Sequence, residues 1–396
     1  MTKKRTVLLH GPLYVQAGYG VHARQIATIL DSYDEFEVFL QATIWGNTPF
    51  MLANFKEKEM LDRMNGNNDH RPEKFDISVQ VILPDEFKDD LADFNIGISA
   101  CVETTICNPE WITATNKMDL MIVPSQHTKR VLENSGTITT PLYVIPEAFP
   151  PTLEDTNLEC NLSGIELETE FNFLHVGQLA AGLEEDDRKG IYTLIRLFCK
   201  AFAGNQDVGL VLKTNSCRNT TIDYKITTNT LNEVIKKHRK GEYPKIYLLH
   251  GPMKETEMCQ LYKHDKIKAF VSLTRGEGYG LPLLEAAAAG LPIVATNWSG
   301  HLDFLNLTRK SFIKVNYELQ KIRDGKVDNR IFMSGTKWAH IDEEDAMKKM
   351  TKLVESYKVP QDWAKELQPL IIDRFNINSI GKTFKEVLAR HYNMDN

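Results

Sequence analysis

Short apolar runs alternate along the chain with segments whose apolar residues recur at helical spacing. The apolar runs predict strands at 6–11, 37–43, 78–83, 95–100, 120–123, 142–145, 172–177, 209–213, 245–250, 269–273, 292–296 and 312–315. Helical periodicity lies between them, at 21–30, 128–134, 191–202, 229–238 and 254–263. Such alternation indicates an α/β fold of doubly wound parallel sheets. Ligands are then expected at the carboxyl ends of the strands.

The alternation stops between residues 146 and 168, where two prolines and a polar, acidic run show no regular period. A chain of 396 residues is long enough for two domains. We therefore expect two Rossmann-like domains, at 1–150 and 171–372, with a linker at 151–170. Residues 373–396 continue as a helix that we expect to pack back on the first domain.

Composition narrows the class of protein. Hydrophobic residues make up 42% and charged residues 25%, as in a globular protein, and no apolar run reaches the length of a membrane span. The six cysteines form no C-x-x-C pair, which indicates buried thiols in a reducing compartment rather than disulfides or a zinc site. We expect a cytoplasmic protein. A net charge of −6 disfavours a nonspecific nucleic-acid coat, and the oligomeric state stays open.

One segment, residues 274–300, carries the densest candidate chemistry. A strand runs into Leu273, the next loop holds three glycines, and a helix is expected to begin at Pro282. The free N–H groups and dipole of a helix start favour an anion, most often a phosphate. Glu277 and Glu285 flank this helix start, eight residues apart, and would repel a phosphate unless they face hydroxyls. A sugar nucleotide supplies both the phosphates and the hydroxyls.

Cations at neighbouring strand ends fit the same ligand. Arg188 and Lys189 follow one predicted strand and Lys213 ends the next, and positive side chains there would neutralise a diphosphate. For Arg188 and Lys189, an exposed ion-pair surface with the acids before them is the alternative. Lys213 closes an apolar run, and a half-buried lysine usually has a partner.

A glycine pair, Gly18 and Gly20, precedes the first predicted helix. With Ala23 it fits G-x-G-x-x-A, the dinucleotide fingerprint, so an NAD-dependent enzyme is an alternative. A long loop after the first strand and the lack of an acid after the second oppose that interpretation. A turn that simply requires glycine and a loop that touches a sugar or phosphate stay open.

The segment Glu277-x7-Glu285, followed by Gly290-Leu291-Pro292-Ile293-Val294, resembles the E-x7-E signature of retaining glycosyltransferases of family 4. Weaker similarities extend over most of the chain. They are Gly18-Tyr19-Gly20, Val123-Pro124-Ser125 with Thr128-Lys129, Val176-Gly177 with Lys189-Gly190, and His250-Gly251-Pro252. This resemblance implies the GT-B fold, two Rossmann-like domains that face a cleft, with an acceptor bound by the first and a nucleotide sugar by the second.

The resemblance also implies roles. Glu285 would hold the donor ribose and Glu277 would approach the transferred sugar, while Arg188 or Lys189, with Lys213, would hold the diphosphate. The full set of implied donor-binding residues is Gly18, Gly20, Arg188, Lys189, Lys213, His250, Gly251, Gly278, Tyr279, Gly280, Leu281 and Glu285. Because the chain has no D-x-D motif, we expect no metal, and no cofactor besides the nucleotide-sugar co-substrate.

Glu103 follows the fourth predicted strand, where family members often carry a histidine, so it is a second catalytic candidate beside Glu277. An exposed loop acid without a role is the alternative. The chain also has Pro146-Glu147-Ala148-Phe149 where many relatives have an Asn-Gly turn, so the acceptor side departs from the family pattern.

We therefore expect a retaining hexosyl- or pentosyltransferase that uses a nucleotide-diphosphate sugar, with UDP favoured. Its acceptor would be a saccharide, a lipid-linked glycan, or a hydroxylated base in phage-type DNA. Alternatives of another class are a sugar-nucleotide epimerase, an NAD-dependent enzyme, and a non-catalytic sugar-nucleotide-binding subunit.

Overall fold

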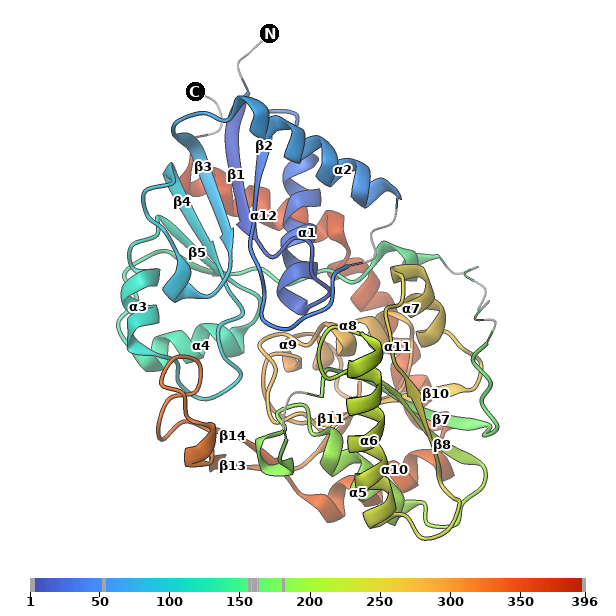
Figure 1. The fold of residues 1–396 in the computed structure, drawn as a ribbon. Coiled ribbons are helices and arrows are strands. Elements are labelled where there is room, and N and C mark those ends of the chain that lie inside the picture. The colour runs from blue at the N-terminus through green and yellow to red at the C-terminus, as the bar shows by residue number, and fades with distance from the viewer. Residues whose placement is uncertain are drawn as a thin grey trace. The chain divides into compact units, whose positions relative to one another are not determined.

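The computed structural model describes residues 4–51, 55–155, 158, 162, 164–179 and 182–393 (Figure 1). The chain divides into two compact units. Unit 1 comprises Met1–Ala148, Asp328–Met333 and Phe375–Asn396, and unit 2 comprises Phe149–Val327 and Ser334–Arg374. Six positions of the expected linker, 156, 157, 159–161 and 163, lie outside the described residues.

Unit 1 is built on a parallel sheet whose strands lie in the order β2-β1-β3-β4-β5-β6. The strands are β1 (Arg5–Gly11), β2 (Phe36–Ala42), β3 (Phe75–Val81), β4 (Ala92–Ile98), β5 (Leu120–Val123) and β6 (Leu142–Val144). Its helices are α1 (Gly18–Asp31), α2 (Phe55–Gly66), α3 (Pro109–Thr115), α4 (Gln126–Ser135) and α12 (Ile377–His391).

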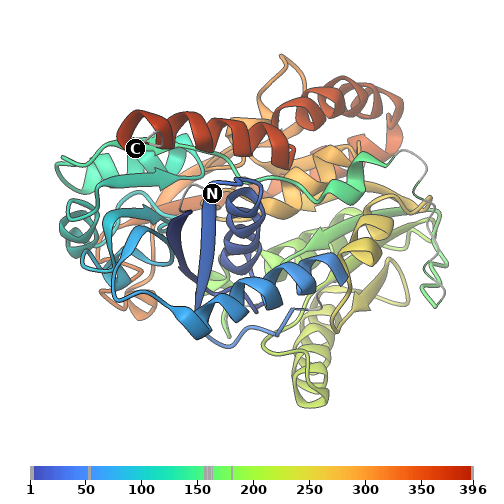
Figure 2. The ribbon, with the colours of Figure 1, turned by 90° about the horizontal axis from the view of Figure 1, so that it is seen from above.

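The C-terminal helix α12 joins the core of unit 1 although it is far from α1 in sequence. Asn376 begins α12 by accepting a hydrogen bond from the Ser379 N–H, at 2.9 Å. Helix α12 lies beside α1 (Figure 2). Phe384 and its apolar neighbours on α12 pack into the same core as α1, and the Tyr33 hydroxyl donates to the Gly381 carbonyl, at 2.8 Å. Burying a side chain the size of Phe384 contributes roughly 1.5–3 kcal/mol, which holds the C-terminal helix on this unit.

Unit 2 has a second six-stranded parallel sheet, in the order β12-β11-β10-β7-β8-β9, and a two-stranded antiparallel hairpin. The strands are β7 (Phe171–Val176), β8 (Val208–Lys213), β9 (Lys245–Leu249), β10 (Ile267–Ser272), β11 (Ile293–Thr296), β12 (Ile313–Val315), β13 (Tyr317–Lys321) and β14 (Lys337–Ile341). The helices are α5 (Ile191–Ala201), α6 (Thr221–His238), α7 (Glu255–Tyr262), α8 (Leu281–Ala288), α9 (Leu302–Leu305), α10 (Glu343–Glu355) and α11 (Lys358–Arg374).

The twelve predicted strands are all confirmed, with ends that differ by no more than three residues. Three local predictions are corrected. Gly18 and Gly20 lie in the first turn of α1 rather than in a loop before it, and α8 begins at Leu281, one residue before Pro282. Helix α6 begins at Thr221 rather than 229, because the Thr220 hydroxyl caps its start by accepting from the Asp223 N–H at 3.1 Å.

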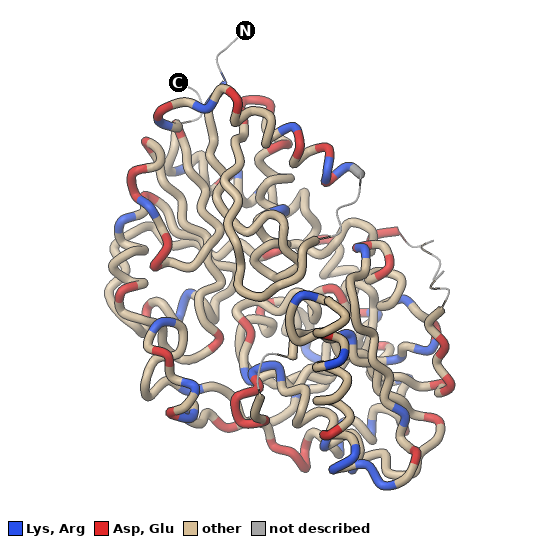
Figure 3. Tube along the Cα trace, in the orientation of Figure 1, with Lys and Arg blue, Asp and Glu red and all other residues tan. Residues whose placement is uncertain are grey.

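Charged residues of both signs are interspersed along the trace (Figure 3), in keeping with the small net charge of −6. Among the described residues, no helix is both long enough and apolar enough to cross a membrane.

Candidate functional site

In unit 2, the carboxyl ends of four adjacent strands carry most of the predicted donor-binding residues. Strands β10, β7, β8 and β9 are consecutive in the sheet, and Glu277, Lys189, Lys213 and His250 follow or end them in that order. The chain runs from β7 outward to β9 and then returns to the other side of β7 as β10. This reversal is the topological switch point, where doubly wound sheets bind ligands.

The start of α8 lies at this switch point. Gly280 precedes the helix with a φ of +103°, a left-handed conformation that favours glycine. The Glu277 N–H donates to the Ser299 hydroxyl, at 2.9 Å, and the Gly300 N–H donates to the Glu277 carbonyl, also at 2.9 Å. A Cβ atom at Gly300 would lie 2.1 Å from the Gly278 carbonyl oxygen, so only glycine fits. The loop before α8 is therefore fixed by the segment that follows β11.

Glu277 contacts two of the three cations predicted for the diphosphate, Lys189 and Arg188. Lys189 Nζ lies 2.7 Å from Glu277 Oε1 and 2.8 Å from Oε2, and Arg188 Nη1 lies 3.4 Å from Oε2. Burial raises the pKa of Glu277, but Lys189 and Arg188 outweigh burial and lower its pKa to about 2. The exposed ion-pair alternative for Arg188 and Lys189 is wrong, because both pair with a glutamate that is only 8% exposed.

Backbone geometry sets Arg188 and Lys189 in place. Gly190 precedes α5 with a φ of +70°, and a Cβ atom there would lie 2.2 Å from the Leu273 carbonyl oxygen. The Arg188 carbonyl accepts from the Arg275 N–H, at 2.7 Å, so the segment after β7 is hydrogen-bonded to the segment after β10. Arg188 Nη1 also donates to the Gly276 carbonyl, at 2.8 Å. The protein's own backbone contacts thus position the two cations.

Glu285, on the second turn of α8, has a different environment from Glu277. The Tyr262 hydroxyl of α7 donates to Glu285 Oε2, at 2.7 Å. Burial raises the pKa of Glu285 to about 7, with a further contribution from Glu255, while the Tyr262 hydrogen bond acts in the opposite direction. The two glutamates of the motif therefore have pKa values on opposite sides of the ordinary value.

Lys213 and His250 lie at the ends of β8 and β9. Lys213 Nζ donates to the Gly251 carbonyl, at 2.5 Å, and burial lowers the pKa of Lys213 to about 8. His250 Nε2 lies 3.3 Å from Asp223 Oδ2. The Asp223 carboxylate also accepts backbone N–H groups of the loop after β8, which hold its pKa below the ordinary value against the opposing effect of burial.

Of the remaining predicted residues on this loop, Tyr279 and Leu281 have buried side chains. The Tyr279 ring packs edge-on against Phe304, with ring centroids 5.2 Å apart. Any contact of Tyr279 or Leu281 with a ligand would therefore come from the backbone, as would that of Gly278 and Gly280.

Sequence reasoning missed several buried polar residues of this site. His301 is fully buried, with Nε2 2.8 Å from the Thr296 carbonyl, and Ser299 supports Glu277 from a φ of +92°. Ser299 and His301 follow a predicted strand, and that position was the available signal. His175, buried on β7, and Tyr262, inside a helix, carried no such signal.

The predicted residues Gly18, Gly20 and Glu103 lie in unit 1. A Cβ atom at Gly20 would lie 2.2 Å from the Val15 carbonyl oxygen, so local packing alone accounts for glycine there. A Cβ atom added at Gly18 would meet no atom within 4 Å, so local packing does not require glycine there. Glu103 is half-buried in the segment after β4. The donor role of the glycines and the catalytic role of Glu103 remain predictions.

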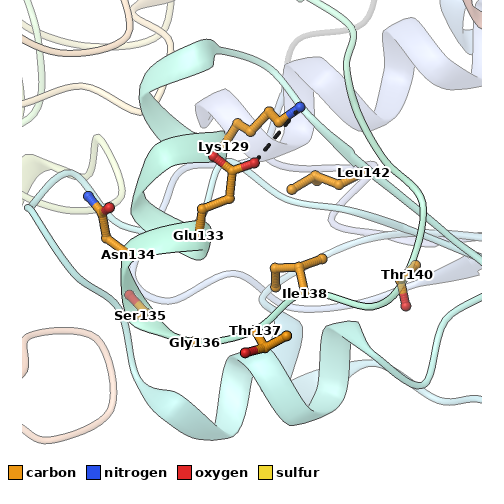
Figure 4. Close-up of a pocket in the computed structure, with 9 residues that line it drawn as sticks. All are labelled: Lys129, Glu133, Asn134, Ser135, Gly136, Thr137, Ile138, Thr140 and Leu142. Carbon is orange, nitrogen blue, oxygen red and sulfur yellow. Dashed lines mark ion pairs between the residues drawn. The ribbon is translucent and has the colours of Figure 1, made fainter.

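A surface pocket in unit 1 is lined by Lys129, Glu133, Asn134, Ser135, Gly136, Thr137, Ile138, Thr140 and Leu142 (Figure 4). Its lining runs along α4 and into Leu142, the first residue of β6, so part of it lies at the amino end of that strand. Because ligands of parallel sheets bind at the carboxyl ends, this pocket is not the candidate site.

Comparisons with known proteins bear on the same region. The family model described as glycosyl transferases group 1 matches residues 222–325, a stretch that contains Glu277, Glu285 and His250. Two curated proteins, from Oryza sativa subsp. indica and subsp. japonica, are each described as a probable sucrose-phosphate synthase 1 and are 34% identical to this chain over 89 residues. That match covers 22% of this chain and 7% of each rice protein.

Solved structures resemble nearly the whole chain. The sucrose-phosphate synthase of Thermosynechococcus elongatus superimposes with a TM-score of 0.65. The superposition covers 98% of this chain and 99% of the synthase chain. Anabaena HepE in complex with UDP and glucose superimposes with a TM-score of 0.63, over 98% of this chain and 100% of the HepE chain. Both are 13% identical to this chain, a level at which the likeness establishes the fold: two parallel sheets with interleaved helices, as in GT-B proteins.

Proposed function

Because the chain carries a group 1 glycosyltransferase domain on a GT-B fold, we propose that the protein is a retaining glycosyltransferase. It would move a hexosyl or pentosyl group from a UDP-sugar to a hydroxyl of an acceptor. The observation that carries this proposal is the contact of Glu277 with Lys189 and Arg188 at the start of α8, on the switch point of unit 2.

The charges at this site suit a sugar diphosphate. Lys189 and Arg188 both contact the Glu277 carboxylate, so two cations lie at the start of α8, where a diphosphate would bind. Arg188 and Lys189 exceed Glu277 by one positive charge, and Lys213 adds a second when it is protonated. Helix N–H groups at Gly280 and Leu281 add donors. Together they would stabilise the negative charge that develops on UDP as the glycosidic bond breaks.

The two glutamates then face hydroxyls rather than phosphates. Glu285 Oε2 is occupied by Tyr262, which leaves Oε1 to accept from the ribose. Glu277 is held ionised by its cations and would accept from hydroxyls of the transferred sugar. The nucleotide base would lie beside His250 and Gly251, at the end of β9. The UDP and glucose bound to HepE support the choice of a uridine donor.

Transfer would retain the anomeric configuration. The departing phosphate oxygen takes the proton of the incoming acceptor hydroxyl on the same face of the sugar, so no enzymic nucleophile is required. Exclusion of water would suppress hydrolysis of the donor. The acceptor would be held by unit 1.

The test is to incubate the purified protein with UDP-glucose, UDP-N-acetylglucosamine, UDP-galactose and UDP-xylose, with and without saccharide acceptors. Released UDP and the glycosylated product are measured, the product by mass spectrometry. We expect UDP release with at least one donor, and loss of at least 100-fold in kcat for Lys189→Ala, as on removal of one oxyanion-stabilising donor. Lys348→Ala is the matched control, since Lys348 is an exposed lysine of α10.

Unchanged turnover in Lys189→Ala would remove the diphosphate role of Lys189. An isomerised UDP-sugar without UDP release would instead identify an epimerase, and donor binding without turnover in every mixture would identify a binding subunit. A product dependent on added NAD would point to the dehydrogenase alternative.

A further inference from the structure

Two loops at the ligand edge of unit 1 form one structural piece. They are residues 11–20, after β1, and residues 43–51, after β2, and we call them the loop platform. Three backbone hydrogen bonds join them: Thr43 N–H to Gly11 O (3.0 Å), Gln16 N–H to Pro49 O (2.8 Å) and Met51 N–H to Tyr14 O (3.0 Å). Val15 and Phe50 also pair as an antiparallel bridge. The backbone of the platform is therefore fixed from both sides.

This fixed backbone displays apolar side chains to solvent. Ile44 is 85% exposed and Phe50 is 76% exposed, the two highest values for large apolar side chains in the described part of the chain. Beside them, the half-buried Trp45 stacks on Tyr19, with ring centroids 4.2 Å apart and an interplanar angle of 28°. Exposed apolar side chains that are grouped on an ordered surface mark an interaction site.

The loop platform carries no charge. Residues 11–20 and 43–51 contain no Lys, Arg, Asp or Glu, and the trace is tan through both loops (Figure 3). Phosphate-bearing acceptors, nucleic acids included, are bound mainly through Lys and Arg. The side chains of this surface therefore offer no positive charge to a phosphate, and they suit an uncharged acceptor group.

The loop platform is also tied to the carboxyl end of β4. The Tyr19 hydroxyl and the Ser99 hydroxyl share a hydrogen bond of 2.8 Å, and the Cys101 N–H donates to Ser99 Oγ, at 3.2 Å. Cys101 has a φ of +51°, an unfavourable conformation for a residue with a Cβ. Backbone strain of this kind clusters at ligand sites, and the half-buried Glu103 follows two residues later in the same segment.

We propose that the loop platform binds the apolar aglycone of an uncharged glycoside acceptor, with the aglycone on Ile44, Trp45 and Phe50. This inference rests on the proposed function, because it names the class of acceptor for the same transfer. It disfavours the phosphates of a nucleic acid or of a phosphorylated lipid as the group that contacts this surface. The location at the carboxyl ends of β1, β2 and β4 places the aglycone at the ligand edge of the sheet.

The experiment measures binding of methyl, butyl and hexyl glycosides of glucose, galactose, mannose and xylose by calorimetry, in the presence of saturating UDP. For at least one sugar, we expect the hexyl glycoside to bind about tenfold more tightly than the methyl glycoside. Ile44→Ser and Phe50→Ser should remove most of this chain-length dependence, and Phe50→Leu should largely retain it. Val359→Ser, at a 52% exposed position of α11, is the matched control and should change nothing.

Affinity that does not depend on alkyl length, or the absence of binding by every hexyl glycoside, overturns the inference. So does a platform variant that alters only the oligomeric state or only binding to neutral phosphatidylcholine vesicles, since the occupant would then be a second copy or a lipid surface. UDP release from a UDP-sugar, measured without acceptor, reports on the proposed function separately. If the chain-length dependence is found but no donor is ever turned over, the proposed function fails while the glycoside site stands.

Discussion

At Glu277, burial and neighbouring cations act on the pKa in opposite directions, and the cations prevail. The folded-state pKa of about 2 lies below the ordinary value of 4.5, so ionisation of Glu277 stabilises the folded protein above pH 4.5, and this contribution is lost as the pH falls toward 2. We predict that Glu277→Gln lowers the free energy of unfolding by about 3 kcal/mol at pH 7 and by about 1 kcal/mol at pH 3.

Thermal unfolding at the two pH values checks this prediction. Glu233→Gln, at an exposed position of α6, serves as the control and should leave the midpoint unchanged at both. An equal loss at pH 7 and pH 3 for Glu277→Gln would mean that packing, and not the charge of Glu277, stabilises the loop before α8.

The pKa of Glu285 is about 7 and that of Lys213 is about 8, which gives donor binding a defined pH profile. If the ribose donates to Glu285, affinity rises as the pH increases through about 7 and Glu285 ionises. If the diphosphate needs a charged Lys213, affinity falls as the pH increases through about 8. We predict a bell-shaped profile for UDP-glucose, and only the rising limb for uridine, which has no phosphate.

Calorimetric titration from pH 5.5 to 9 separates the two limbs. Glu285→Gln should remove the rising limb, and Lys213→Met the falling one. Tyr262→Phe should move the rising limb to higher pH, because the Tyr262 hydrogen bond lowers the pKa of Glu285. A flat profile for uridine would contradict the ribose role of Glu285.

At the scale of elements, the start of α5 tests whether backbone geometry positions the cations. Gly190 and Gly204 have similar φ values, +70° and +75°, but only Gly190 has a carbonyl where a Cβ atom would lie. A left-handed residue other than glycine costs about 1–2 kcal/mol. We predict that Gly204→Ala lowers the free energy of unfolding by about that amount. Gly190→Ala should lower it by roughly 2–5 kcal/mol, because overpacking adds about 1–3 kcal/mol.

The two variants should differ more in donor binding than in stability. Gly190→Ala should weaken UDP-glucose binding at least tenfold by moving Arg188 and Lys189, and Gly204→Ala should leave it unchanged. Equal affinities of the two variants, measured by calorimetry, would show that the cations adjust independently of α5.

The elements that sequence predicted best are those whose pattern is local. Each buried strand is a continuous apolar run, so its period is visible without knowledge of its neighbours. Strands β13 and β14 were not predicted, because four of the five residues of β13 are exposed and β14 buries only Trp338 and Ala339, too few for a recognisable apolar run. The start of α6 was placed too late, because its first turns bury the polar Asp223 and Thr227 and expose Ile222 and Ile226, so no apolar residues mark the buried face there.

The residues of the candidate site also divide into those with a local sequence signal and those without one. Glu277, Glu285, Arg188 and Lys189 stand beside glycines and strand ends, and those local signals identified them. Tyr262 contacts Glu285 from another helix, 23 residues away in sequence, and that contact depends on how α7 packs against α8. No local pattern encodes such a contact.

At the scale of the whole molecule, the chain moves from one unit to the other more often than two domains in sequence require. Residues 328–333 belong to unit 1, between two stretches of unit 2. Asp328 shapes this short segment locally, because its carboxylate accepts the N–H groups of Arg330, Ile331 and Phe332 at 2.8–2.9 Å. Nothing in the sequence pattern predicted that an insertion near residue 330 would join the amino-terminal unit.

Two kinds of contact hold this segment in unit 1, and their magnitudes differ. Arg330 pairs with Asp85 and Glu86, at 2.6 Å each, but its side chain is 51% exposed, so the pairs contribute less than about 1 kcal/mol. Ile331 and Phe332 are half-buried against the apolar cluster around Trp111, and full burial of either side chain would contribute roughly 1.5–3 kcal/mol. The apolar contact should therefore be the principal anchor.

We predict that Phe332→Ser greatly accelerates amide hydrogen exchange in residues 328–333 and in α3, whereas Arg330→Ala changes it by less than about fivefold, the equivalent of 1 kcal/mol. Exchange in β7 and β8 should be unchanged in both variants, since these strands belong to unit 2. Raising the salt concentration should reproduce the small effect of Arg330→Ala and not the large effect of Phe332→Ser. If Arg330→Ala instead has the larger effect, the ion pairs anchor the segment and its attachment to unit 1 becomes dependent on ionic strength.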